Sequence, residues 1–386
     1  CILALYDASV ACDAGAIAAL RDELDQRAEL GPLWASGRAL FRTDATRAVA
    51  GSFNDWSTTA VVTAPLCGSD LILGVGTVAT GYHQYKLYDP ATSSWTLDPH
   101  DPAFAYDDFT GNPDGRNSVL ATPDSGRGYT VTFGETCSTT LGNCREVTAY
   151  LPAGYDALDA KDRRYPVLFM HDGQNLWSDH GCCFGHTGWE LDAALDTEIG
   201  EGRVAPVIVI GAASTTSRNT EYGLDRTAAA AFMAFQIDEL QPKVLAKVRW
   251  DAQPVGIGGS SLGGLTAMDL ALAYPETYAA AVALSGAFWP GREDVDALRD
   301  RIPTYGKQPV AIYLDHGGNV AANSDGAADS VEVRDELMAL GWSRSDSPSC
   351  TASPNTVCYH SEPGATHDEL AWKARTWRFL RYLYPR

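Results

Sequence analysis

The sequence has few positive charges and no long apolar run. It contains 29 Lys and Arg residues against 49 Asp and Glu residues, which gives a formal net charge of −20. This charge disfavours nucleic acids and anionic membranes as partners, because both carry negative charge themselves. No stretch approaches the roughly 20 consecutive apolar residues that a membrane-spanning helix needs. We therefore expect a globular protein without a transmembrane segment.

The sequence also has neither an initiator Met nor a signal peptide, and it begins at Cys1. A mature N-terminal Cys is typical of lipid-modified bacterial lipoproteins. The apolar run Ile2–Leu5 differs from the small, polar tether that usually follows such a residue. Lipid attachment at Cys1 therefore stays open as an alternative to a freely secreted protein.

The cysteines and histidines do not show the spacing of a zinc site. Nine cysteines are nevertheless many for a cytosolic enzyme. Two pairs bracket short polar loops and predict local disulfides, namely Cys137 with Cys144 and Cys350 with Cys358. Such bonds indicate an oxidising compartment, so we expect an extracellular, periplasmic or cell-surface protein. The adjacent Cys182-Cys183 could bond to each other or to different partners.

The length of 386 residues suggests two domains. Residues 16–30 have apolar positions at helical spacing, and 46–120 contain short alternating runs typical of an all-β domain. Small residues, Gly and Pro dominate 121–128 and indicate the boundary. We predict an N-terminal helix with an all-β domain over 1–124 and a second domain over 125–386.

In the second domain, apolar runs alternate with helical stretches. This pattern predicts a mostly parallel sheet with helices on both faces. The predicted strands are 145–151, 165–170, 204–211, 254–258, 279–284 and 310–314, and the predicted helices are 189–199, 227–248, 262–274, 295–302, 331–340 and 369–383. Sites in such sheets lie at the carboxyl ends of the strands, so loops that follow strands are the candidates.

A nucleophile is predicted in one of these loops. Gly259-Ser260-Ser261-Leu262-Gly263 has the G-x-S-x-G pattern between an apolar run and a helical stretch. That motif places a serine on a sharp strand-to-helix turn, where glycines allow strand and helix to approach each other. We predict that Ser261 is the nucleophile.

A serine nucleophile needs a histidine base and an acid that orients the histidine. His367 lies in a Gly-containing loop just before the C-terminal helix, and we predict that it is the base. For the acid, Asp325 lies in a loop beyond the strand that ends near Asp315. We favour Asp325 because the acid should reach the imidazole from a loop, and we keep Asp315 and, more weakly, Asp329 as alternatives.

Two backbone amides are predicted to form an oxyanion hole. One is that of Leu262, which follows the nucleophile, and the other is that of Gln174, in the loop after the strand over 165–170. Asn175 is the alternative for the second amide. The same loop continues to Trp177, which we expect to line the substrate pocket.

From Arg145 to the C-terminus, the chain resembles the esterase branch of the α/β-hydrolases. This branch includes enterochelin and feruloyl esterases, S-formylglutathione hydrolase and mycolyltransferases. The matching motifs are His171-Asp172-Gly173-Gln174-Asn175-Leu176, Arg218 with Glu221-Tyr222, Gly258 to Gly264, Tyr313-Leu314-Asp315-His316-Gly317, and His367-Asp368-Glu369 with Trp372. The resemblance implies an α/β-hydrolase fold and a triad of Ser261, Asp325 and His367. Here Gly317–Val320 lacks the acid that the family often has after this strand.

The stretch from Val49 to Ala121 resembles the immunoglobulin-like glycogen-binding module of the AMP-activated kinase β subunit and of starch-branching enzymes. The shared motifs are Gly-Ser-Phe-Asn-Asp-Trp, His-Gln-Tyr-Lys, and a Trp followed by Asp-Pro. The resemblance implies a β-sandwich whose Trp56, Lys86 and Trp95 would bind a glucan. Such a module can also serve only as a packing domain.

These patterns predict a secreted serine ester hydrolase that needs neither a metal nor an organic cofactor. Its expected substrate is a sugar-linked or aromatic acyl ester, either a small molecule or part of a polysaccharide, as for feruloyl or acetyl esterases. Trp177, Arg218 and Asp172 are the predicted substrate-binding residues. A siderophore lactone esterase is the main alternative, and acyl transfer or carbohydrate binding without catalysis are weaker ones. The oligomeric state is not predicted.

Overall fold

The computed structural model describes residues 2–25, 31–107, 115–157, 160–178, 182–183, 187–293 and 296–386. Cys1, the end of the first predicted helix and Val295 lie outside these ranges. The chain forms two compact units, Cys1–Thr132 with Ala153–Lys161, and Phe133–Pro152 with Asp162–Arg386. The division falls slightly after the boundary expected from sequence, and a short later segment returns to the first unit.

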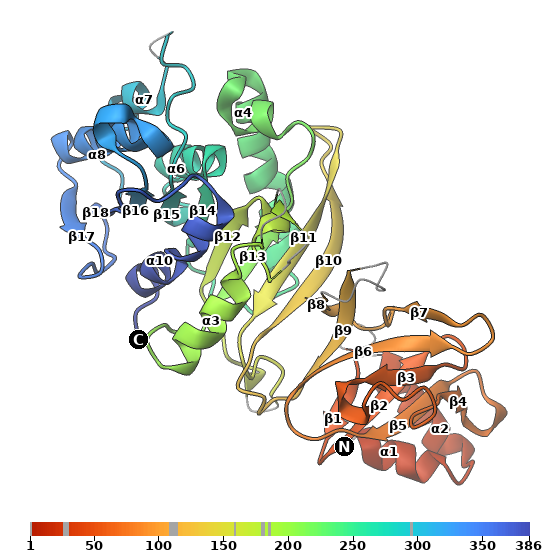
Figure 1. The fold of residues 1–386 in the computed structure, drawn as a ribbon. Helices are drawn as coiled ribbons and strands as arrows, with labels where there is room; N and C mark the ends of the chain where they lie inside the picture. Colours follow the sequence, from red (N-terminus) through yellow and green to blue (C-terminus); the bar gives the residue numbers. More distant parts are fainter. Residues whose placement is uncertain are drawn as a thin grey trace. The chain divides into compact units, whose positions relative to one another are not determined.

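The first unit begins with two helices that cover a small antiparallel sheet. The helices are α1 (Ile2–Ser9) and α2 (Ala14–Asp25), and the strands, in spatial order, are β1 (Leu33–Ala35), β2 (Arg38–Thr43), β5 (Ile72–Thr77) and β4 (Ala64–Pro65) (Figure 1). Leu20 and Leu24 of α2, at helical spacing, pack with Leu40 and Leu73 of the sheet. Apolar burial therefore joins the helices to the strands.

A second group of antiparallel strands completes the first unit. Its members are β3 (Ala48–Gly51), β6 (Tyr82–Asp89), β7 (Ser94–Thr96), β8 (Ala103–Tyr106), β9 (Arg116–Ala121) and the start of β10 (Tyr129–Cys137). Phe41 of β2, Val49 of β3 and Tyr85 of β6 belong to one buried cluster. Side chains from both strand groups thus share a core, while the immunoglobulin-like assignment stays a prediction.

The second unit is built on a mostly parallel sheet, as predicted. From one edge, the strands follow the order β17 (Ser343–Asp346), β18 (Thr356–Ser361), β16 (Ala311–His316), β15 (Tyr278–Leu284), β14 (Val255–Ser260), β12 (Val167–His171), β13 (Ile208–Ala212), β11 (Cys144–Leu151) and the end of β10. Only β11 runs antiparallel to its neighbour β13 among the pairs from β11 to β17. The sequence prediction missed β17 and β18, whose short runs carry many polar residues.

The register brings strand ends together at the carboxyl edge of this sheet. Ser260 pairs with Leu284, and Leu284 pairs with Asp315. Ser261 directly follows the end of β14, and Ser285 directly follows the end of β15. Loops that follow these three strands therefore start in one row, where a site in a parallel sheet is expected.

Two groups of helices pack together in the second unit. In one, α3 (Leu191–Gly200) contacts α10 (Thr376–Leu383), and in the other α7 (Leu298–Tyr305) contacts both α6 (Leu262–Ala273) and α8 (Ala327–Ala339) (Figure 1). The predicted helix over 227–248 is interrupted. It consists of α4 (Arg226–Ala234), a π-helical turn (Phe235–Leu240) and α5 (Gln241–Leu245), because Pro242 lacks the amide hydrogen of a regular helix.

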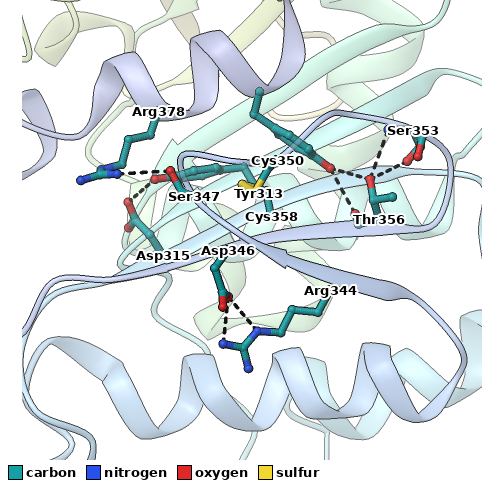
Figure 2. The surroundings of a disulfide bond; sticks show 11 residues. Tyr313, Asp315, Arg344, Asp346, Ser347, Cys350, Ser353, Thr356, Cys358 and Arg378 are labelled. Atoms are coloured by element: carbon teal, nitrogen blue, oxygen red, sulfur yellow. Dashed lines mark hydrogen bonds and ion pairs between the residues drawn. A yellow bond between two sulfur atoms is a disulfide. The ribbon is translucent and has the colours of Figure 1, made fainter.

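The described cysteines form disulfides, and both predicted local pairs are confirmed. The bonds are Cys12–Cys67, Cys137–Cys144, Cys182–Cys183 and Cys350–Cys358. Figure 2 shows the last of these, which joins the loop after β17 to Cys358 of β18. In the same loop, Ser347 accepts a hydrogen bond from Arg378 (3.3 Å). Within the described ranges, no helix has the length and apolar character to cross a membrane.

Candidate active site

Ser261 occupies a sharp turn between β14 and α6. Its φ of 54° lies in the left-handed region, which is costly for a residue with a side chain and is often found at functional sites. A Cβ on Gly259 would lie 2.7 Å from the carbonyl carbon of Gly263. The first glycine of the motif is therefore required by the close approach of strand and helix. The Ser261 amide donates to Leu284 O at 3.0 Å, which fixes the turn against β15.

His367 and Asp325 form a hydrogen-bonded pair at the same edge of the sheet. His367 precedes α9 (Glu369–Lys373), and its Nδ1 lies 2.5 Å from Asp325 Oδ1. The side chain of Asp325 is 2% exposed, while that of His367 is 41% exposed. The buried carboxylate thus holds the Nδ1 edge of an imidazole that is partly exposed to solvent. Trp372 packs edge-on against this imidazole, with ring centroids 5.2 Å apart.

The two alternative acids have other partners. Asp315 is fully buried and accepts hydrogen bonds from Arg375 Nε (3.0 Å) and the Tyr313 hydroxyl (3.1 Å), the latter visible in Figure 2. Burial raises the pKa of Asp315, and the charge of Arg375 opposes that rise. Asp329 pairs with Arg292. Of the three aspartates weighed from sequence, Asp325 is the one that contacts His367.

The structure does not join Ser261 to His367 directly. Over the described ranges, neither the Ser261 hydroxyl nor the second ring nitrogen of His367 makes a hydrogen bond. Ser261 is connected to Asp325 only indirectly. The Ser261 amide donates to Leu284 O, and the hydroxyl of the next residue, Ser285, donates to Asp325. The Ser261–His367 step of a triad stays a prediction.

Both predicted oxyanion donors are amides at the start of helical turns. Leu262 is the first residue of α6, so its N–H has no acceptor within the helix. Gln174 lies in a short 3-10 turn (Gly173–Asn175), and its side chain is held by two hydrogen bonds with Ser214, of 2.9 and 3.0 Å. The Asn175 amide donates to Asp172 O (2.8 Å) and is therefore engaged. This leaves Gln174 as the better candidate.

The predicted substrate-binding residues are engaged inside the protein. Arg218 donates two hydrogen bonds of 2.7 Å to Asp172, so each neutralises the other. Trp177 is 1% exposed, and its indole donates to Thr148 (2.8 Å). As a correction to the expectation from sequence, the ring of Trp177 belongs to the core and presents no face to a substrate, because the turn after Asn175 directs it inward.

Beneath this loop lies a buried histidine. His171 ends β12, and its ring packs against Tyr222 and Phe232 at centroid distances of 5.1 and 5.6 Å. Burial lowers the pKa of His171 to about 4. The imidazole is therefore neutral at physiological pH and acts as a packing group.

In the first unit, the three residues of the predicted glucan platform have different environments. Trp56 and Trp95 are 39% and 37% exposed, and their ring centroids lie 6.4 Å apart. Tyr88 packs against Trp95 at 4.9 Å. Lys86 is buried, with 4% of its surface exposed. Its predicted contact with sugar hydroxyls is therefore not available, because the side chain is enclosed by the strands.

Sequence reasoning missed two polar residues of the site, Ser285 and Arg375. Ser285 directly follows β15 at the carboxyl edge, which was a usable signal. Arg375 lies between α9 and α10, and no local pattern points to it. With regard to metals, the described residues contain no group of three or more His, Cys, Asp or Glu side chains that could hold an ion.

Comparison with known proteins identifies relatives of this chain. A family model described as "Putative esterase" matches residues 138–375. An endo-1,4-beta-xylanase/feruloyl esterase of Xylanibacter ruminicola is 27% identical over 53% of this chain and 26% of its own length. An iron(III) enterobactin esterase of Dickeya dadantii is 29% identical over 45% of this chain and 36% of its own length. The chain thus spans about a quarter to a third of these relatives.

Solved structures that are similar to this chain include two esterases. A ferric enterobactin esterase from Salmonella typhimurium has a TM-score of 0.48 and 18% identity, covering 93% of this chain and 98% of that one. A ferulic acid esterase has a TM-score of 0.49 and 17% identity, covering 66% of this chain and 98% of that one.

Proposed function

The chain belongs to the esterase family whose model matches residues 138–375, and from this we propose that it is a serine carboxylic-ester hydrolase. The observation that carries the proposal is the bond between His367 and Asp325, at the sheet edge where the strained turn of Ser261 lies. A serine, a histidine and a buried carboxylate at such an edge support nucleophilic acyl transfer.

In the proposed reaction, Ser261 Oγ attacks the ester carbonyl carbon while His367 accepts the hydroxyl proton. Asp325 keeps the imidazole oriented and stabilises its charged form. His367 then gives the proton to the leaving alcohol, which leaves an acyl group on Ser261. Water attacks this acyl-enzyme with the same histidine as base, and the carboxylic acid is released.

The oxyanion of each tetrahedral intermediate is proposed to bind the amides of Leu262 and Gln174. Preorganised N–H groups stabilise this charge more strongly than water does, because they need no reorientation during the reaction. The side-chain bonds between Gln174 and Ser214 support this role, since they fix the turn that carries the amide.

As the substrate, we propose a sugar-linked or aromatic acyl ester. The name of the Xylanibacter relative supports a feruloyl-type ester, and the exposed Trp56 and Trp95 support a sugar-bearing partner. A siderophore lactone is the second candidate, favoured by the name of the Dickeya relative. Binding such a bulky anion would require basic side chains that are free to pair with it, whereas Arg218 is paired with Asp172. We also propose an oxidising location, which the disulfides support.

Hydrolysis of p-nitrophenyl acetate, methyl ferulate and enterobactin tests the function and the substrate together. We expect turnover of the first two and loss of all turnover in Ser261→Ala. Faster cleavage of enterobactin than of methyl ferulate would replace the feruloyl assignment by the siderophore one. An inactive wild-type protein that also resists labelling by a fluorophosphonate probe would contradict the serine hydrolase itself.

A further inference from the structure

We propose that Ser285 and Arg375 are positioning residues that hold the carboxylate of Asp325 behind His367. The inference rests on the proposed function and deepens it, because it concerns the same catalytic acid. It extends the candidate triad inward to a buried chain of hydrogen bonds that runs from His367 through Asp325, Ser285 and Arg375 to Asp315.

The direction of the hydrogen bonds at Ser285 is fixed by chemistry. Arg375 Nη2 lies 2.8 Å from Ser285 Oγ, and Ser285 Oγ lies 2.7 Å from Asp325 Oδ2. A guanidinium can only donate, so the serine oxygen must accept from Arg375. The single hydroxyl hydrogen of Ser285 is then free to point at the carboxylate. Ser285 is fully buried, so no solvent competes for this bond.

Both oxygens of Asp325 are used. Oδ1 contacts His367 Nδ1 at 2.5 Å, while Oδ2 accepts from Ser285 and from the amide of Gly317. Asp325 itself has a φ of 57°, in the left-handed region, within a short 3-10 turn (Ser324–Gly326) that directly precedes α8. The hydrogen bonds to His367, Ser285 and Gly317 therefore set how the carboxylate is oriented.

Arg375 is in turn fixed by Asp315. Both side chains are 0% exposed, and Arg375 Nε lies 3.0 Å from Asp315 Oδ2. Asp315 also accepts from Tyr313 and from the Ser285 amide (3.0 Å). A buried guanidinium needs such a partner, and its planar fork then fixes where Nη2 points. The aspartate at the tip of β16 thus serves the catalytic acid indirectly.

The network matters most when His367 becomes positively charged. Asp325 must stay ionised and aligned at that moment. Ser285 donates a hydrogen bond to the carboxylate, and the positively charged Arg375 orients the Ser285 hydroxyl. Other titratable or charged groups near this chain of hydrogen bonds, among the described residues, include Tyr313, which bonds to Asp315, His360, which acts on Asp315, and Arg378, which acts on Tyr313. None of these three contacts Asp325, so Ser285 is the link that a mutation can remove.

Ser285→Ala tests the link, with Ser330→Ala as the matched control. Ser330 is also fully buried, but its hydroxyl has no partner among the described residues. With p-nitrophenyl acetate, we expect kcat/KM of Ser285→Ala to fall about 10- to 100-fold through kcat, as for a misplaced catalytic group. We also expect the acid limb of its pH profile to move to lower pH, because a displaced carboxylate stabilises the imidazolium less.

Ser330→Ala should keep wild-type kinetics and pH profile. Wild-type kinetics in Ser285→Ala, or a loss without a change in the pH profile, would overturn the positioning role. If Ser285→Ala does not fold, the double variant Asp315→Asn/Arg375→Met, which removes both buried charges together, should show the same fall in kcat. Activity retained in both Ser261→Ala and Asp325→Asn would instead contradict the proposed function itself.

Discussion

At the scale of single residues, the aspartates near the end of β16 have different surroundings. Asp325 bonds to His367, whereas Asp315 bonds to Arg375 inside the core. We expect Asp325→Asn to lower kcat about 10⁴-fold, because the neutral amide no longer holds the required imidazole tautomer. Asp315→Asn should instead lower stability by about 3–5 kcal/mol, since Arg375 keeps a buried charge without its partner.

Kinetics and urea unfolding of the two variants measure these effects. The kcat loss in Asp315→Asn should be at least about tenfold smaller than in Asp325→Asn. The reverse order would make Asp315 the catalytic acid.

The buried His171 should make the stability of the protein depend on pH. Its folded pKa of about 4 lies below the ordinary value of 6.5, so unfolding takes up a proton as the pH falls. The stabilisation is therefore complete above about pH 6.5 and is lost as the pH falls toward 4. When the pH is lowered from 7.5 to 5, this one group should reduce the free energy of unfolding by about 2 kcal/mol. Urea unfolding at both pH values, with His171→Gln as the comparison, measures it. An equally steep loss in the variant would contradict the prediction.

At the scale of elements, the turn over Gly173–Asn175 depends on close backbone packing. A Cβ on Gly173 would lie 2.5 Å from the carbonyl carbon of Gly211, so the turn must move away from β13. We expect Gly173→Ala to lower kcat about 10²- to 10³-fold through displacement of the Gln174 amide. Gly200→Ala is the matched control, because that position in α3 has open space around it. Similar kinetics of both variants would argue against an oxyanion role for this turn.

At the scale of the whole molecule, we predict that the first unit binds a carbohydrate and that the second unit carries the catalytic site. We expect binding of the full chain to an insoluble glucan through Trp56 and Trp95, whose exposed rings can stack on pyranose faces. Trp56→Ala/Trp95→Ala should lose glucan retention in a pull-down but keep its rate with p-nitrophenyl acetate. Leu224→Ala, which removes an exposed apolar side chain of the second unit, should retain binding. Unchanged retention in the double Trp variant would limit the first unit to a packing role.

Features that depend on local patterns could be predicted from the amino-acid sequence. The alternation of strands and helices from Arg145 onward, the turn at Ser261 and two disulfides with short loops follow from periodicity, glycine spacing and short chain closure. These features involve neighbours in the chain, whose geometry the residue types restrict directly. The same reasoning placed His367 in a loop before the last helices.

Contacts between side chains that are distant in the sequence could be identified only in the folded protein. Asp325 rather than Asp315 contacts His367, Arg218 is occupied by Asp172, and Lys86 and Trp177 are buried. Each outcome depends on loop conformations and on partners far away in the chain, such as Arg375 for Asp315. Burial and pairing of a charge are set by all surrounding elements together, so the residue type and its position after a strand were not sufficient to predict them.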